Sequence, residues 1–144
     1  AIFISRLLNG EPPLVFEDGE QKRDFVHVAD VAEAFATVLE SDKRVWEVFN
    51  VGSGQSVTVN SIARTLARLL RKNIAPQVLD KYRVGDIRHC FADISRIEKA
   101  FEFKPRRQFD DGMEELIRWV VTARKPIDRS ASSLAELTRG RMVV

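Results

Sequence analysis

Residues 17–32 read EDGEQKRDFVHVADVA, and this stretch contains the signals for a turn, a strand and the start of a helix. The four residues Glu17–Glu20 are of types that favour tight turns. Apolar and polar side chains then alternate over residues 24–28, which predicts a strand. Asp30 is followed three residues later by Glu33, the spacing of a capping box, so a helix is expected to begin there.

The residues after Asp30 have one apolar side at helical spacing. Apolar side chains recur every three or four positions, at Val31, Ala34, Phe35, Val38 and Leu39. This stripe predicts an amphipathic helix that packs on one side and ends near the polar run of residues 41–44.

The same kinds of signal occur on both sides of this unit. Further strands are predicted at residues 14–16, 46–51, 76–79 and 90–94. Further helices are predicted at residues 2–8, after a cap at Thr58, at 95–101 behind a second capping box of Ser95 and Glu98, from about Asp110, and from Ser133 to Gly140. Because helices and short strands alternate, the expected class is α/β, with an α+β-like character. Residues 1–124 are expected to form one unit and residues 125–144 a C-terminal tail with a short helix.

The composition is typical of one soluble globular domain. The chain has 144 residues, of which 44% are apolar and 31% are charged. Its 23 Lys and Arg against 21 Asp and Glu leave a net charge of +2, too balanced to indicate nucleic-acid binding. No apolar run approaches the roughly 20 residues of a membrane span. The one cysteine, Cys90, excludes an internal disulfide and favours a reducing compartment, so we expect a cytoplasmic protein. From the net charge and the lack of a long apolar run, we expect it to bind neither nucleic acid nor membranes.

The first residues have no polar lead-in. Ile2–Leu8 already shows an apolar helical pattern, whereas natural N-termini are more often polar and poorly ordered. We therefore expect the sequence to be a fragment of a longer protein. Apolar surface that the rest of that protein would cover is then exposed in this chain, and it favours self-association.

Several kinds of site are disfavoured by residue type and spacing. His89 and Cys90 are adjacent and His27 is remote from them, so no metal site is expected. The run Gly52–Gly54 lacks the third glycine of a dinucleotide fingerprint, because Val57 stands at that position. We interpret these glycines as a turn between a strand and a helix.

Two arginines and an aspartate have the chemistry to hold a nucleoside diphosphate. Arg23 and Arg83 lie in polar segments beside predicted elements, and a guanidinium presents paired donors that match two oxygens of a diphosphate. The carboxylate of Asp86 can accept hydrogen bonds from two ribose hydroxyls. The same three residues also fit surface ion pairs, which loop arginines commonly form. Residue chemistry alone leaves both interpretations open.

Three stretches in this order resemble the NAD-dependent epimerase/dehydratase family, extended short-chain dehydrogenase/reductase proteins that act on nucleotide sugars. Residues 17–32 are similar to the family's DGxQxRDFVHVxDVA stretch, and residues 49–54 (FNVGSG) to its (Y/F)NVGSG step. Residues 83–95 (RVGDIRHCFADIS) are similar to RxGDxRxxxADxSK. Residues 103–105 match the following (L)G(F/W)xP only in part, because Glu102 replaces the usual glycine. The resemblance covers residues 1 to about 124 and points to members such as UDP-glucose 4-epimerase, near the dTDP-L-rhamnose 4-epimerase branch.

The resemblance implies a two-lobed enzyme, of which this sequence matches one lobe. In the family, an N-terminal Rossmann lobe binds NAD and carries a catalytic Tyr-x-x-x-Lys group, and a C-terminal lobe holds the nucleotide of the sugar substrate. This sequence is similar to the second lobe only, and its one tyrosine, Tyr82, has Asp86 rather than Lys four residues on. The resemblance thus implies no catalytic and no cofactor-binding residue in this chain, and NAD held by the missing N-terminal lobe of the parent enzyme.

The family's substrate-binding positions are matched residue by residue. Arg23 and Arg83 match the arginines that clamp the pyrophosphate, and Asp86 matches the acid that meets the ribose hydroxyls. Val15 and Phe16 match the short strand that lies against the base. Structural roles, as loop hydrogen bonds and helix caps, are expected for four other signature residues, His27, Asp30, Asn50 and Asp93.

The implied function is to bind the nucleoside-diphosphate sugar for an NAD-dependent nucleotide-sugar epimerase. The lobe would anchor the nucleotide while the sugar turns, and the chain alone would be inactive. Two alternatives stay open, a dehydratase or reductase of the same family and a stand-alone nucleotide-binding or regulatory module. The expected partners are a nucleoside-diphosphate sugar, the N-terminal Rossmann lobe and further copies of the chain.

Overall fold

The computed structural model describes residues 2–122, 130–140 and 142–143, which form six helices and five short strands. The helices are α1 (Ile2–Leu8), α2 (Val28–Glu40), α3 (Val59–Leu69), α4 (Ser95–Phe101), α5 (Phe109–Thr122) and α6 (Ser130–Arg139). The strands are β1 (Leu14–Val15), β2 (Lys22–Arg23), β3 (Val57–Thr58), β4 (Gln77–Val78) and β5 (His89–Cys90). This small mixture of helices and strands confirms the expected α/β class. None of the described helices has the length and hydrophobicity needed to cross a bilayer.

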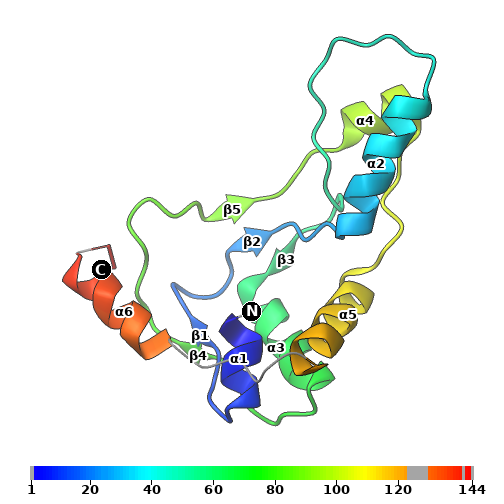
Figure 1. Cartoon of the computed structure of the whole chain (residues 1–144). Coiled ribbons are helices and arrows are strands. Elements are labelled where there is room, and N and C mark those ends of the chain that lie inside the picture. Colours follow the sequence, from blue (N-terminus) through cyan, green and yellow to red (C-terminus); the bar gives the residue numbers. More distant parts are fainter. Residues whose placement is uncertain (1, 123–129, 141, 144) are drawn as a thin grey trace.

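The strands form two small sheets from segments that are distant in the sequence. β1 and β4 are parallel, with Leu14 opposite Gln77. In the second sheet, β2 lies between β3, to which it is antiparallel, and β5, to which it is parallel. Figure 1 shows this second sheet in the middle of the molecule and β1 and β4 beside α1. The two pairings bring the segment after β1 and the segment before β5 to one place.

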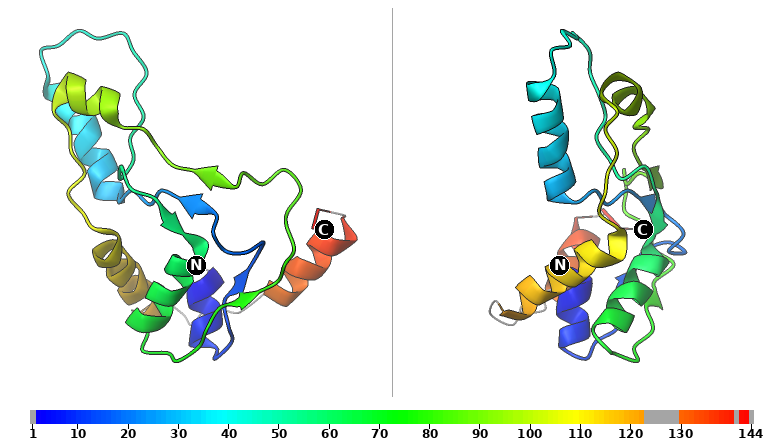
Figure 2. Two further views of the ribbon diagram at one scale, coloured as in Figure 1. Left: turned by 180° about the vertical axis from the view of Figure 1, so that it is seen from behind. Right: turned by 90° about the vertical axis from the view of Figure 1, so that its right-hand side faces the viewer.

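The buried apolar residues form two separate clusters. The first joins α1, α3 and α5, through Ile4, Leu7, Ile62, Leu66, Ala67 and Val120. The second joins α2 and α4, through Ala34, Ile94, Ile97, Phe101 and Phe103. Figures 1 and 2 show the two groups of helices at opposite ends of the molecule, with the three-stranded sheet between them.

Several elements lie where the sequence predicts them. Thr58 caps α3 as expected, because its hydroxyl oxygen accepts a hydrogen bond from the backbone N–H of Ser61 at 3.1 Å. α1 covers the predicted residues 2–8, and β1 and β4 fall within the predicted strands 14–16 and 76–79. Helices at these places follow from apolar spacing and caps, both of which are local properties of the sequence.

The start of α2 differs from the prediction. The strand predicted over residues 24–28 is absent, and the two-residue β2 ends just before it at Arg23. The ring of Phe25 packs edge-on against that of Phe109, with 5.5 Å between the ring centres. The helix begins at Val28, and its cap is His27, whose Nδ1 accepts the N–H of Ala29. The predicted capping box at Asp30 is wrong because the imidazole already satisfies that turn.

Asp30 has a different structural role. It is buried in the first turn of α2, where its carboxylate accepts hydrogen bonds from the backbone N–H and the guanidinium of Arg107, at 3.1 and 2.7 Å. Burial raises the pKa of Asp30, but the hydrogen bonds from Arg107 and the backbone of Arg106, together with the charge of Arg107, outweigh that effect and hold the pKa below its ordinary value of 3.8. The pair fixes the segment before α5 to α2.

The strand predicted at residues 46–51 is not among the described strands. A strand needs a neighbouring backbone for its hydrogen bonds, and none of the five described strands pairs with this segment. Its apolar side chains divide between two environments. Phe49 and Val51 pack against the cluster of α2 and α4, whereas Trp46 is 99% exposed and Val48 is 81% exposed.

Three smaller predictions are also corrected. The strand predicted over 90–94 is present only as β5, which includes Cys90. α4 begins at Ser95, but its cap residue is Ile94, which makes no side-chain capping bond, so the second capping box is wrong. The nearest substitute is Asp93, whose carboxylate accepts the N–H of Ser95 at 2.9 Å. α6 starts at Ser130, three residues before the predicted start.

Candidate functional site

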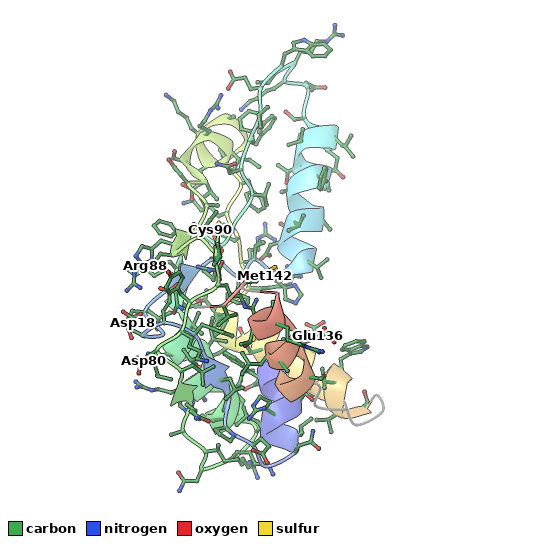
Figure 3. All side chains as sticks on the ribbon, turned by 90° about the vertical axis from the view of Figure 1, so that its left-hand side faces the viewer. Asp18, Asp80, Arg88, Cys90, Glu136 and Met142 are labelled. Carbon is green, nitrogen blue, oxygen red and sulfur yellow. The ribbon has the colours of Figure 1, made fainter. Side chains whose placement is uncertain are left out.

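A cleft of about 440 Å³ lies between the turn that follows β1 and the loop that leads from β4 to β5. It is lined by Glu17, Asp18, Asp80, Lys81, Tyr82, Arg83, Asp86 and Arg88. Figure 3 shows three of these residues, Asp18, Asp80 and Arg88, along one edge of the molecule. The volume falls within the range of small-molecule sites, and seven of the eight lining residues are charged.

A tight turn places two of the predicted binding residues side by side. The backbone N–H of Asp86 donates to the carbonyl of Arg83 at 3.1 Å, and Gly85 between them has a φ of 80°. A positive φ at the third residue is the pattern of a type II turn, which requires glycine or asparagine there. The sequence Arg-Val-Gly-Asp therefore holds Arg83 and Asp86 at the two ends of one turn.

Arg23 reaches this turn from β2. Its Nη2 lies 3.3 Å from a carboxylate oxygen of Asp86, and its Nη1 donates to the carbonyls of Lys22 and Arg88, both at 2.9 Å. These three bonds leave two of the five N–H groups of the guanidinium without a partner among the described residues. Arg23 and Asp86 are 28% and 44% exposed, so a ligand can reach both.

Arg83 lies over the ring of Phe16, with its guanidinium carbon 4.7 Å from the ring centre. Phe16 directly follows β1, so the pairing of β1 with β4 carries this ring to the cleft. A guanidinium stacks on an aromatic face through its planar shape and its charge. Arg83 has no ion pair in the part of the chain that the structure describes, which leaves its charge available to an anion.

Arg88 joins the two sides of the cleft. Its guanidinium donates to the carboxylates of Glu17 and Asp18, at 2.6 and 2.7 Å. The hydrogen bond from Arg88, with a second one from the N–H of Glu20, holds the pKa of Asp18 below its ordinary value of 3.8. Sequence patterns do not identify Arg88 as a site residue, because its partners are about 70 residues away and no local pattern joins them.

The predicted site residues come together with one qualification. Arg83 and Asp86 line the cleft, and Arg23 and Phe16 contact these two residues. The side chain of Val15 is completely buried. Val15 therefore offers no side-chain surface to a ligand and serves to anchor Phe16, since its carbonyl accepts the N–H of Leu79 at 2.9 Å. A contact of Val15 with substrate stays a prediction.

The four signature residues expected to be structural do make structural contacts. Besides the cap by His27, the ion pair of Asp30 and the hydrogen bond of Asp93, the amide of Asn50 donates to the carbonyl of Asp93 at 3.3 Å. His27 also lies 3.2 Å from Glu115, which connects α2 to α5. No group of three or more metal-ligating side chains occurs among the described residues.

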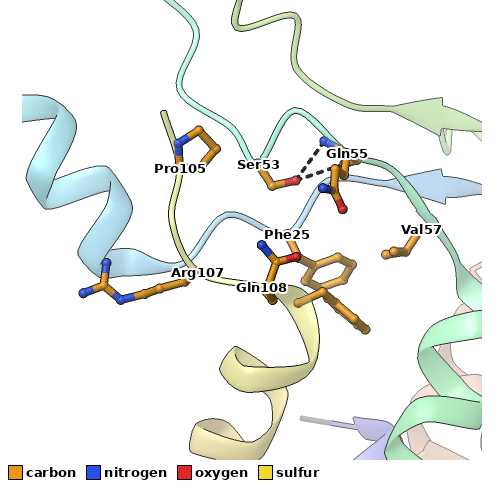
Figure 4. Close-up of a pocket in the computed structure, with 8 residues that line it drawn as sticks. Phe25, Ser53, Gln55, Val57, Pro105, Arg107 and Gln108 are labelled. Carbon is orange, nitrogen blue, oxygen red and sulfur yellow. Dashed lines mark hydrogen bonds between the residues drawn. The ribbon is translucent and has the colours of Figure 1, made fainter. Parts of the chain in front are cut away.

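The Gly52–Gly54 turn does not fit a dinucleotide. The N–H of Ser53, which a phosphate would need, donates instead to the carboxylate of Asp24 at 2.9 Å. A Cβ atom on Gly52 would lie 2.5 Å from both Asp24 and Ala92, so the glycine is needed where the protein packs on itself. A cavity of about 40 Å³ beside this turn (Figure 4) has space for water but not for a nucleotide.

The chain is similar in sequence and structure to known proteins. Residues 1–52 match the family model described as "NAD dependent epimerase/dehydratase family". A dTDP-L-rhamnose 4-epimerase from Burkholderia thailandensis is 34% identical over 107 residues, which are 74% of this chain and 29% of that protein.

Two solved structures are also similar. A UDP-N-acetylglucosamine 4-epimerase from Methanobrevibacter ruminantium, in complex with UDP-N-acetylmuramic acid, has 39% identity and a TM-score of 0.74. A UDP-glucose 4-epimerase from Thermotoga maritima, with UDP-glucose, has 30% identity and a TM-score of 0.75. In both cases the match covers 84% of this chain and 38% of the other, so the chain spans about a third of the length of the proteins it matches. The chain belongs to the NAD-dependent epimerase/dehydratase family of extended short-chain dehydrogenase/reductase proteins.

Proposed function

We propose that this chain binds the nucleoside diphosphate of a nucleotide sugar on behalf of an NAD-dependent nucleotide-sugar 4-epimerase. One observation carries the proposal. Arg83 and Asp86 line one charged cleft, and Arg23, 63 residues from Asp86 in the sequence, reaches Asp86 with its guanidinium. Surface ion pairs alone would not require a second arginine at the same place with its charge unpaired.

The chemistry of the three side chains suits the two ends of a nucleoside diphosphate. Arg23 and Arg83 supply N–H donors and positive charge to the phosphate oxygens. The carboxylate of Asp86 accepts hydrogen bonds from the ribose hydroxyls, and the ring of Phe16 offers an apolar face to the base. The two similar solved structures support this assignment, because both hold a UDP-linked ligand.

The proposed task is to anchor the substrate by a part that does not react. Binding energy from a remote group holds the sugar in place for the chemical step. The described residues form no dinucleotide cradle at the Gly52–Gly54 turn, so we propose that NAD and the catalytic groups belong to a separate Rossmann lobe. That lobe and the nucleotide sugar are the two partners of the proposal.

Two other functions compete with this one. A dehydratase or reductase of the same family would use the same nucleotide contacts, and the proposed residues surround the nucleotide rather than the sugar. We favour an epimerase because the relative and the two structures compared above are 4-epimerases. A stand-alone nucleotide-binding module would bind the nucleotide alone as tightly in isolation as with any Rossmann lobe added.

The proposal is tested by titrating the chain with UDP and dTDP in a calorimeter. Arg83→Ala is expected to weaken binding about 10- to 100-fold, because a hydrogen bond to a charged group contributes about 1.5–3 kcal/mol. Arg64→Ala is the matched control, since Arg64 lies on the exposed side of α3 and lines a different surface groove. Equal affinities of the Arg83→Ala variant and the unchanged chain would show that Arg83 does not bind the diphosphate.

The chain alone is expected to show no NAD binding and no turnover of UDP- or dTDP-sugars. The physical reason is that the Gly52–Gly54 turn holds its N–H on Asp24, and Tyr82 has no lysine four residues on. Fluorescence titration with NADH and a coupled epimerase assay check this. Measurable turnover by the isolated chain would contradict the proposal that NAD and the catalytic groups belong to a separate Rossmann lobe.

A further inference from the structure

The C-terminal segment Met142–Val143 lies against the turn that carries Arg83 and Asp86. The backbone N–H of Val84 donates to the carbonyl of Met142 at 2.9 Å, and Arg83 pairs with Val143 in an antiparallel bridge. The segment returns to this place from α6, and the N–H of Met142 donates to the carbonyl of Leu137 at 2.9 Å. Figure 1 shows α6 beside the loop between β4 and β5.

The loop has few other backbone contacts. All residues from 80 to 91 are exposed, whereas Val143 is only 9% exposed. Backbone hydrogen bonds anchor the loop at its two ends, from Glu17 to Lys81 and from Lys22 to Arg88. Between those ends, among the described residues, the backbone contact with another segment is the one with Met142 and Val143. An exposed loop that is held elsewhere by side-chain contacts alone would open more readily without this backbone contact.

We propose that Met142–Val143 is a strap that holds the Arg83–Asp86 turn in its ligand-binding position. The proposal rests on the proposed function, because it assigns the strap to the same nucleotide site. The strap adds a second strand to the backbone of Arg83 and Val84, so the guanidinium of Arg83 stays over Phe16 and Asp86 stays beside Arg23. Val143 acts as a positioning residue, and it does not line the cleft.

We expect substitutions in the strap to leave the rest of the protein folded. The described members of the two apolar clusters all lie at or before Val120, so Val143 is not one of them. Val143→Asp places a charge at a buried apolar position and is expected to detach the segment. Val143→Ile keeps the position apolar. Met142→Ala is the matched control, because its side chain is 52% exposed and its contribution comes from the backbone.

The first measurement is hydrogen exchange of the loop, which needs no ligand. In the unchanged chain the Val84 amide is expected to exchange slowly. Val143→Asp is expected to speed its exchange at least tenfold, with Val143→Ile and Met142→Ala near the unchanged rate. A melting temperature within a few degrees of the unchanged chain excludes general unfolding. Unchanged exchange of Val84 in Val143→Asp would overturn the strap.

The second measurement is the affinity for UDP. When a site is formed for only a fraction of the time, the apparent Kd rises by the inverse of that fraction. Val143→Asp is therefore expected to weaken UDP binding about three- to tenfold. Val143→Ile is expected to bind UDP as tightly as the unchanged chain. An unchanged Kd would overturn the positioning role. A tighter Kd would overturn it too, because the segment would then obstruct the site.

The two proposals fail in different ways. If the unchanged chain does not bind UDP or dTDP, the proposed function fails, and hydrogen exchange alone then decides whether the strap holds the turn. If the unchanged chain binds UDP and Val143→Asp binds it equally well, the proposed function stands and the strap is wrong.

Discussion

Arg88 ties together two segments that are about 70 residues apart in the sequence. One guanidinium satisfies two carboxylates, and the carbonyl of the same residue accepts a hydrogen bond from Arg23 at 2.9 Å. Arg88 is therefore connected both to the wall of the cleft and to Arg23, one of the residues proposed to bind the phosphates. Exposed ion pairs contribute little singly, but a two-carboxylate network of this kind fixes geometry.

This contact predicts how Asp18 titrates. The hydrogen bond from Arg88 is the main cause that holds the pKa of Asp18 below 3.8. Because the folded-state pKa is lower than the unfolded one, the stabilisation is fully present above about pH 3.8 and is lost as the pH falls through the folded value. Arg88→Ala is expected to raise the pKa of Asp18, as measured by an NMR titration of its carboxyl carbon.

Asp93 provides the internal control for that titration. Its pKa is also lowered, but mainly by the hydrogen bond from the backbone N–H of Ser95, and it makes no contact with Arg88. The pKa of Asp93 should therefore be the same in both proteins. If the pKa of Asp18 also stays unchanged in Arg88→Ala, the ion pair does not persist in solution.

At the scale of elements, the turn from Arg83 to Asp86 depends on its glycine. Gly85 has a φ of 80° and a Cβ atom there would meet nothing within 4 Å, so a substitution costs backbone strain and no steric clash. Gly85→Ala is expected to cost about 1–2 kcal/mol in the turn and to weaken UDP binding about 5- to 30-fold. Gly85→Asn should recover part of the affinity, because asparagine tolerates this conformation.

Gly10 is the control for this effect. It has a φ of 81° and equally open surroundings, but it follows α1, away from the cleft. Gly10→Ala should lower the melting temperature as Gly85→Ala does and leave the affinity for UDP unchanged, as measured by calorimetry. Equal losses of affinity in the two variants would show that the turn has no special connection to binding.

How well the elements could be predicted depends on the range of the interactions that form them. α3 follows from its apolar spacing and the cap at Thr58, which lie within one segment. The start of α2 cannot be read from the sequence, because an imidazole cap has no strong sequence pattern and because Asp30 bonds to Arg107, 77 residues away. The segment 46–51 has the composition of a strand, but its partner cannot be read from its own residues.

The features of the candidate site also differ in whether they follow from local sequence or from contacts between distant segments. Arg23, Arg83 and Asp86 were predicted because they lie in recognisable motifs. The burial of Val15, the pairing of Arg88 with the Glu17–Asp18 turn and the strap at Val143 all depend on contacts between distant segments. Such contacts leave no periodic pattern in the sequence, so they required the structure.

At the scale of the whole molecule, one side of α2 is apolar and exposed. Val28, Phe35 and Leu39 are 67–82% exposed, and their spacing of seven and four places them on one face of the helix. Exposed apolar surface of this kind usually marks an interface. We expect a concentration-dependent association of the chain through this face, observed as a rise in the mass by light scattering across a dilution series.

A charge on that face should prevent the association. Phe35→Glu is expected to keep the mass of a monomer at concentrations where the unchanged chain associates. Val121→Glu is the control, because Val121 is also exposed but lies on α5. A chain that stays monomeric at high concentration without any substitution would rule out this interface.

The pairing of distant strands also determines at which stage of folding the cleft forms. The contact of Lys22 with His89 closes a loop of 67 residues, and that of Arg23 with Asp86 spans 63. The entropy lost on closing such long loops must be overcome before these contacts add any stability. Local helices such as α3 can form early, whereas the cleft exists only after both closures. A partly folded chain would therefore have helices but no place for a ligand, and ligand binding would report the last stage of folding.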